Sequence, residues 1–201
     1  MKVNTQMLLT DKKIISHIES GNITISPFNK KNVAPCSVKF HLGSSINHLC
    51  SKSPLIDIKD QSTYPILKKI HPDSSGGFIL KKGEVYLAST EEKIGMNPEF
   101  AGFIDGTSNL ARLGVSVVLS GHISCGFGFG KPGILTLEII HHSSPQIRLF
   151  RGMTICNVLI FHLGDKPLQT YGKNSWNHSG EQSVIGSLIY KKYQTLDSNK
   201  E

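Results

Sequence analysis

The chain has 201 residues, of which 38% are hydrophobic and 18% are charged, and its formal net charge is +7. This composition excludes a disordered or fibrous chain and predicts one globular domain over residues 1–201. The basic residues include lysine doublets spread along the chain, without an arginine-rich cluster or interleaved aromatic residues, which favours a solvated surface over a nucleic-acid-binding one.

The first predicted element is an N-terminal helix. Thr10 or Asp11 can serve as its N-cap, isoleucines recur on one face, and Gly21 marks its end. We therefore assign residues 1–21 to an N-terminal helical segment.

The pattern over residues 22–169 is that of β-strands. Short alternating or fully apolar runs are separated by Gly, Pro, Asn and Ser about every ten residues, which predicts an all-β barrel or sandwich. One short helix interrupts it at "SNLARLG", where Ser108 can cap and Gly114 can end the helix. The polar tail over residues 170–201 is expected to be mobile until something orders it.

A glycine-rich stretch, "SGHISCGFGFGKPGILTLE" over residues 120–138, invites comparison with phosphate-binding loops. It does not fit a Walker loop, because Cys125 stands where the first glycine belongs and Pro132 stands where Ser or Thr would hold magnesium. It does not fit a dinucleotide fingerprint either, since a β-branched run follows instead of a helix. What remains is a flexible hairpin connection whose glycines supply positive φ.

The sequence shows no targeting or membrane-spanning segment. No uncharged stretch approaches the roughly 20 residues of a spanning helix, and the opening residues hold no apolar run of signal-peptide length. The four cysteines, Cys36, Cys50, Cys125 and Cys156, include no C-x-x-C pair, which fits reduced thiols. We therefore expect a cytoplasmic protein without a membrane partner.

Four motifs together resemble the core of the dCTP deaminase and dUTPase superfamily. They are "DGTSNLARLG" at 105–114, "SGHIS" at 120–124, "ILTLE" ending in Glu138, and "IRLFRGMTICNVLIF" at 147–161. The similarity extends from the opening helix to Tyr171. It is closest to the deaminase branch, because "SNLARLG" is similar to the deaminase form of this motif, S-S-L-A-R-L-G. In addition, dUTPases usually lack a glutamate at the position of Glu138.

The resemblance implies a distorted jelly-roll-like β-barrel of the dUTPase-like fold, assembled as a homotrimer with active sites between subunits. The expected ligand is dCTP, with Mg²⁺ bound through its phosphates. The glycine-rich stretch would then be the hairpin loop between a strand ending near Ser124 and the strand that carries Glu138.

Deamination at C4 of cytosine needs an activated water and a route for the proton to the leaving ammonia. One solution is zinc, but "PCSVK" at 35–39 lacks a second cysteine, and His122 with Cys125 gives only two ligands, so we expect no zinc. A glutamate at the end of an apolar strand would lie in a partly desolvated pocket and could exchange a proton with water. Glu138 is therefore the predicted base; an exposed strand edge or a buried ion pair is the alternative.

The resemblance assigns two more catalytic roles on the short helix, where residues four apart share a face. Arg112 would be a fixed cation and Ser108 a partner for the water or the base, although such residues alone are more often a surface charge and a cap. Phosphates should meet the start of this helix, where free N–H groups favour anions. The implied substrate-binding positions are Thr107, Asn109, Leu110, Ala111, Ser120, Gly121, Ser124, Thr136, Leu137, Tyr171, His178 and Gln182.

Four positions depart from the family pattern. Thr107 and His178 replace cations that contact phosphate, Ser124 replaces an aspartate required for water activation in dUTPases, and Lys39 replaces a structural aspartate. The pattern favours hydrolytic deamination of dCTP to dUTP and ammonia. A nucleotide-binding or regulatory homologue without turnover, and a dUTPase or bifunctional enzyme, stay open as alternatives, as does the effect of the four changes on substrate choice.

Overall fold

A computed structural model describes residues 7–169, 171 and 177–198, so parts of the predicted segments 1–21 and 170–201 lie outside the described residues. Within these residues the structure has three helices and two 3₁₀ turns: α1 (Asp11–Glu19), η1 (Lys30–Asn32), η2 (Gln61–Thr63), α2 (Ser108–Arg112) and α3 (Ile189–Ser198). The strands are β1 (Ile23–Ser26), β2 (Val33–Ala34), β3 (Ser37–Cys50), β4 (Ile66–Lys69), β5 (Gly77–Leu80), β6 (Val85–Met96), β7 (Phe100–Gly106), β8 (Val115–Ser116), β9 (His122–Ile123), β10 (Gly133–His141), β11 (Ile147–Phe150) and β12 (Thr154–His162).

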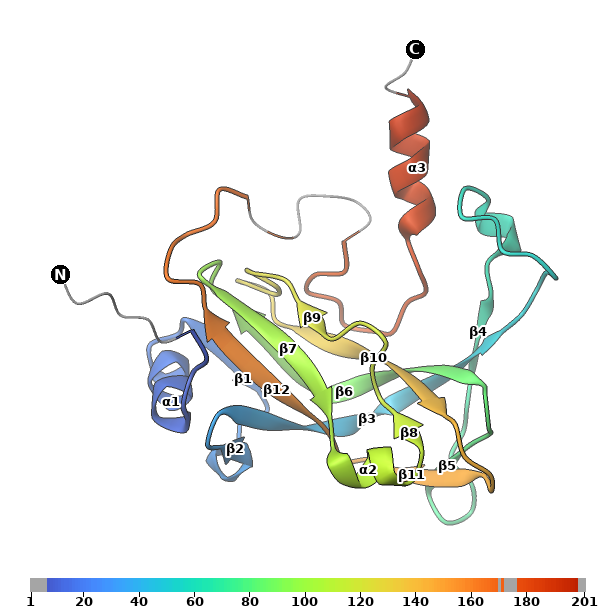
Figure 1. The fold of residues 1–201 in the computed structure, drawn as a ribbon, viewed down its shortest axis with the longest axis horizontal. Coiled ribbons are helices and arrows are strands. Elements are labelled where there is room, and N and C mark those ends of the chain that lie inside the picture. The colour runs from blue at the N-terminus through green and yellow to red at the C-terminus, as the bar shows by residue number, and fades with distance from the viewer. Residues whose placement is uncertain (1–6, 170, 172–176, 199–201) are drawn as a thin grey trace.

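One curled antiparallel sheet makes up most of the fold (Figure 1). Its strand order is β8-β10-β6-β3-β12-β7-β9, with β1 on β6 and with β2 and β4 on β3, while β5 and β11 form a separate ribbon. The long strand β3 joins the two halves, because its first part pairs with β12 and its second part with β6 and β4. The curl follows a register shift between Leu42 and Ile46. The predicted all-β, dUTPase-like fold is confirmed, as a half-barrel.

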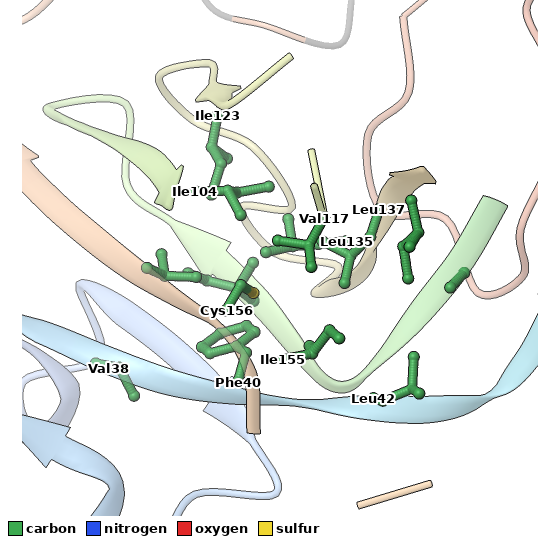
Figure 2. Packing of buried hydrophobic residues seen from close by; sticks show 14 of the residues in the cluster. Val38, Phe40, Leu42, Ile104, Val117, Ile123, Leu135, Leu137, Ile155 and Cys156 are labelled. Atoms are coloured by element: carbon green, nitrogen blue, oxygen red, sulfur yellow. The ribbon is translucent and has the colours of Figure 1, made fainter. Parts of the chain in front are cut away.

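The core lies inside this curl. In β10, buried Leu135, Leu137 and Ile139 alternate with half-buried Thr136 and Glu138, as expected for a strand with one face toward the core. Figure 2 shows the packing of the apolar face of β10 together with residues of β3, β7, β9 and β12, among them Val38, Phe40, Leu42, Ile104, Ile123, Ile155 and Cys156. The other face of β10 is therefore available for a functional site.

Helix α1 agrees with the sequence prediction. Thr10 is the N-cap residue with an extended backbone, Ile14 is fully buried, and Gly21 follows the helix end with a φ of 75°. The chain before the helix is tied to the sheet by the Leu9 N–H, which donates to the Ile160 carbonyl at 2.9 Å.

The N-cap of helix α2 lies one residue earlier than predicted. Thr107, not Ser108, is the N-cap, and its Oγ1 accepts a hydrogen bond from the Leu110 N–H at 3.4 Å. Ser108 is therefore the first helical residue, and it is exposed. Gly114 follows the helix with a φ of 79°, as the prediction of a glycine stop requires.

The glycine-rich stretch is not a hairpin, which corrects the prediction. Strand β9 pairs with β7, whereas β10 pairs with β6 and β8, so residues 124–132 cross between the two halves of the sheet. The predicted positive φ is confirmed at Gly126, Gly128 and Gly130. A Cβ at Gly128 would lie 2.4 Å from the Ile94 carbonyl oxygen, so the glycine lets this crossover lie directly against β6.

The described part of the tail packs on this crossover. Ser179 Oγ accepts from the Gly128 N–H at 3.1 Å, and the Glu181 carbonyl accepts from the Ile134 N–H at 2.9 Å. The tail then leads to α3, an element that the sequence did not predict; its mobility stays a prediction. Within the described residues, none of the helices is both long and apolar enough to cross a membrane.

Candidate active site

A cavity of about 480 Å³ is lined by Thr136 and Glu138 on the half-buried face of β10, and also by Ile134 and Leu135 of that strand. Its walls come from β10, β9, the crossover, the tail and the β3–β4 hairpin. Apolar side chains such as Leu49, Leu87 and Ile104 form much of the lining, and a few polar groups converge on it: Ser120, His122, Ser124, Thr136, Glu138, His178 and Glu181. An apolar pocket of this size with few polar groups is typical of small-ligand sites.

Glu138 lies in this wall with a fixed orientation. Its position in β10 is opposite Leu87 of β6, which also lines the cavity. Its Oε2 accepts hydrogen bonds from the N–H groups of Leu119 and Ser120, at 3.2 and 3.5 Å. Among the described residues Oε1 has no hydrogen-bond partner, so one carboxylate oxygen is available to a ligand or a water in the cavity.

Tyr171 closes one side of the cavity. Its ring stacks on Phe127 of the crossover, with centroids 6.3 Å apart, and its hydroxyl accepts from the His178 N–H at 2.9 Å. Burial raises the pKa of the Tyr171 hydroxyl, so it is protonated at neutral pH and can also donate a hydrogen bond. His178 Nδ1 lies 2.9 Å from Glu181 Oε1, so its side chain is engaged by a neighbouring carboxylate.

Six of the predicted site residues meet at this cavity: Ser120, Ser124, Thr136, Glu138, Tyr171 and His178. The remaining positions lie elsewhere. Leu137 is fully buried, with its side chain in the core, because it alternates with Thr136 and Glu138. Gly121 contributes main chain: its carbonyl accepts from the Ile104 N–H at 2.7 Å.

The residues of α2 do not line the cavity that holds Glu138 in the same chain. Ser108, Asn109, Ala111 and Arg112 are exposed, and Leu110 is buried in the core. Arg112 Nη1 donates to Asn109 Oδ1 at 3.5 Å. In the described residues, the three predicted catalytic side chains are therefore not assembled within a single chain. Figure 1 shows why: α2 follows the far end of β7, next to β8, whereas β9 lies along the earlier part of β7.

Gln182 belongs to a second, smaller cavity of about 270 Å³ that is lined mainly by polar residues. Its amide nitrogen donates to the carbonyls of Pro132 and Gly180, both at 2.9 Å, so it braces the tail on the crossover. Arg151 lies in the same cavity and pairs with Glu91 through two nitrogens, at 2.9 and 2.7 Å.

Some lining residues were not predicted from the sequence. Phe127 was read only as part of a loop, and Glu181 carries no local signal, because its position depends on how the tail folds back. Leu87 could have been found from the alternation of β6. Lys39, one of the four departures, is exposed on β3 opposite Asn157 and lies outside the cavity lining.

No group of three or more His, Cys, Asp or Glu side chains is placed to hold a metal ion among residues 7–169, 171 and 177–198. Magnesium usually keeps phosphate and water ligands and needs one or two carboxylates at most. A nucleotide-borne Mg²⁺ is thus compatible with these side chains and stays a prediction, as does the expected absence of zinc.

Comparison with known proteins gives a consistent result. A family model described as dCTP deaminase-like matches residues 8–163. A protein of Hydrogenobaculum sp. named "dCTP deaminase, dUMP-forming" is 35% identical to this chain, over 80% of this chain and 85% of its own length. A protein of the same name from Streptomyces coelicolor is 32% identical, over 93% of this chain and 97% of its own length. A crystal structure of 2'-deoxycytidine 5'-triphosphate deaminase from Agrobacterium tumefaciens shares the fold, with a TM-score of 0.59 at 17% identity, over 79% of this chain and 49% of that chain. Because the family model covers most of the half-barrel, the chain belongs to the dCTP deaminase-like family.

Proposed function

We propose that this chain is a hydrolase that deaminates the cytosine ring of dCTP. The observation that carries the proposal is Glu138: a carboxylate in the wall of the cavity, held by two backbone N–H groups, with one oxygen free toward a ligand. The names of the relatives support the same substrate.

The reaction follows from what one oriented carboxylate can do. Glu138 takes a proton from a water as that water adds to C4 of the ring, and then returns the proton to the amino group, which leaves as ammonia. Water and dCTP are consumed, and a uracil nucleotide and ammonia are formed. A positioned general base of this kind contributes about 10²–10⁴-fold to the rate. The main chain at Ser120 and Gly121, next to the carboxylate, is the proposed contact for the pyrimidine edge.

We propose that a neighbouring copy completes the site in a homotrimer. Ser108 and Arg112 are exposed and absent from the cavity of their own chain, which leaves them free to enter the cavity of another. Arg112 would then place a fixed positive charge beside Glu138, and the start of α2, including Thr107 and Asn109, would meet the phosphates with their Mg²⁺.

The proposed product is dUTP. Attack of a second water on the phosphate chain needs its own activating group, and Ser124, which lies in the cavity wall, has no carboxylate. A second candidate is the release of pyrophosphate to give dUMP, which is favoured by the names of the relatives. We place either reaction in the cytoplasm.

The test is incubation of the protein with dCTP and Mg²⁺, with chromatography of the nucleotides and assays for ammonia and pyrophosphate. The proposal predicts dUTP and ammonia in equal amounts. Formation of dUMP and pyrophosphate instead would establish the second candidate. A folded protein that is thermally stabilised by dCTP but leaves it unchanged would overturn the proposal in favour of a nucleotide-binding homologue without turnover.

A further inference from the structure

A second group of reactive side chains lies on the opposite face of the sheet from the cavity. Cys50 and His48 are two residues apart at the end of β3, so they project to the same face, while Leu49 between them lines the cavity on the other. Cys50 Sγ is 3.2 Å from His48 Nδ1. His48 Nε2 is 3.3 Å from Glu84 Oε2.

One tautomer of His48 satisfies both contacts. With its hydrogen on Nε2, the ring donates to the Glu84 carboxylate, and Nδ1 keeps a lone pair that can accept the thiol proton. Cysteine, histidine and glutamate then follow one another as nucleophile, base and orienting carboxylate.

Tyr86 holds this arrangement in place. Its hydroxyl donates to Glu84 Oε2 at 2.6 Å and accepts from the Lys81 N–H at 2.9 Å. The ring of His48 packs against the Tyr86 ring, with centroids 5.2 Å apart. Burial raises the pKa of Tyr86 to about 12, so its hydroxyl stays a donor to Glu84 at any physiological pH.

We propose that Cys50 is an activated thiol that undergoes exchange with small anionic disulfides. His48 takes the thiol proton, Cys50 Sγ bonds to one sulfur of the disulfide, and the disulfide's S–S bond breaks. The leaving thiolate takes the proton from His48, so the products are a mixed disulfide at Cys50 and one small thiol.

The surroundings of the thiol suit an anionic reagent. Cys50 is partly exposed, and the side chains of His48 and Glu84 are 26% and 30% exposed. Lys68, which is exposed and pairs directly opposite His48, adds a positive charge on the same face. Lys81 Nζ lies 3.9 Å from Glu84 Oε1.

Two other cysteines of the chain serve as internal controls. Cys36 is exposed and has no hydrogen-bond partner among the described residues, so it reports the reactivity of an ordinary accessible thiol. Cys156 is fully buried, which raises the pKa of its thiol to about 12, so it should stay unmodified while the protein is folded.

The experiment treats the native protein with oxidised glutathione at neutral pH and follows each cysteine by peptide mass spectrometry. Cys50 is expected to form the mixed disulfide about tenfold faster than Cys36, because His48 Nδ1 lies 3.2 Å from Cys50 Sγ and can accept the thiol proton during the attack. His48→Gln should bring Cys50 down to the rate of Cys36 or below it and leave the rate of Cys36 unchanged. Cys50 that is no faster than Cys36, or that is unaffected by His48→Gln, overturns the proposal.

A folding control keeps the test decisive. If Cys156 reacts in His48→Gln, that variant has opened, and Glu84→Gln, which keeps the side-chain size, decides in its place. If Cys50 forms the mixed disulfide more slowly in Glu84→Gln than in the wild type while Cys156 stays unreactive, the proposed activation of Cys50 by His48 and Glu84 is supported. An unchanged rate at Cys50 overturns it. The readout is a mass shift that needs no turnover of dCTP, so it is independent of the proposed function.

Discussion

At the scale of single residues, the proposed chemistry depends on the ability of Glu138 to accept a proton. Glu138→Gln keeps the length of the side chain but cannot act as a base, so deamination should fall by about 10²–10⁴-fold. Because the rest of the cavity is unchanged, stabilisation by dCTP in a thermal shift assay should persist. Chromatography of the nucleotides measures the first effect.

The control is the same change at an unrelated carboxylate. Glu99 lies in the turn before β7, with its side chain 43% exposed, and it is absent from the cavity lining. Glu99→Gln should therefore deaminate dCTP at the wild-type rate. Equal losses in the two variants would show that the loss of any negative charge, and not the loss of a base at Glu138, explains the result.

At the scale of elements, the crossover over residues 124–132 carries the tail onto the sheet, and Gly128 is its tightest point. Gly128→Ala would strain a φ of 62° and place a Cβ 2.4 Å from the Ile94 carbonyl oxygen. Gly130→Ala would strain a similar φ of 76° in open space. A residue in the left-handed region costs about 1–2 kcal/mol, so both variants should lose that much.

The clash with the backbone should make Gly128→Ala the less stable variant, by a further ~1–3 kcal/mol, as for other overpacked positions. Urea unfolding of the two proteins measures the difference. Since Ser179 Oγ accepts from the Gly128 N–H, Gly128→Ala should also become sensitive to proteolysis in the tail before it unfolds. Equal stability of the two alanine variants would contradict the close packing on β6.

Helix α1 should make stability depend on pH through His17. Its ring packs edge-on against Phe100 at 4.8 Å and stacks beside His162 at 6.5 Å. Burial first, then the charges of His162 and Lys13, lower the pKa of His17 from its ordinary value of 6.5. As the pH falls below 6.5, His17 is therefore protonated more fully in the unfolded chain than in the folded one. The free energy of unfolding present above pH 6.5 is lost on acidification toward the folded-state pKa.

Thermal unfolding between pH 7 and pH 5 checks this sign. The wild type should lose melting temperature over this range, and His17→Gln, which cannot be protonated, should lose less. Exposed His71 offers the same substitution away from α1, and His71→Gln should follow the wild-type curve. A His17→Gln curve that is parallel to the wild type would remove His17 as the cause.

The sequence predicts elements best where the signal is local. Alternating residues identify β10, and Gly21 and Gly114 end their helices, because strand period and positive φ are properties of short segments. The pairing of β9 and β10 with different strands was missed, because strand partners are set by packing between distant residues. Helix α3 was missed because its polar segment reads as a tail. Glu138 was predicted at the end of its strand, but β10 continues to His141, so Glu138 lies within the strand. The position of Glu181 depends on the path of the tail.

At the scale of the whole molecule, the three predicted catalytic side chains are divided between two surfaces. Glu138 lines the cavity, and Ser108 with Arg112 lie exposed on α2, outside that cavity. In a ring of identical subunits, a head-to-tail interface can bring the α2 surface of one copy to the cavity of the next. Gel filtration with light scattering should then give a trimer.

Mixing two inactive variants tests whether each site is shared. Glu138→Gln and Arg112→Ala should each be inactive alone, but a trimer made from both can contain a site with Glu138 from one chain and Arg112 from the next. Random assembly of an equal mixture gives such a site with a chance of one half times one half, so about a quarter of wild-type activity should return in the unfractionated mixture of cyclic trimers. Each mixed trimer holds one such site in three, so about a third of wild-type activity is expected once the mixed trimers are isolated. Co-expression with two affinity tags isolates the mixed trimers. If mixed trimers stay inactive while the wild type assembled in the same way is active, Glu138 and Arg112 must act within one chain.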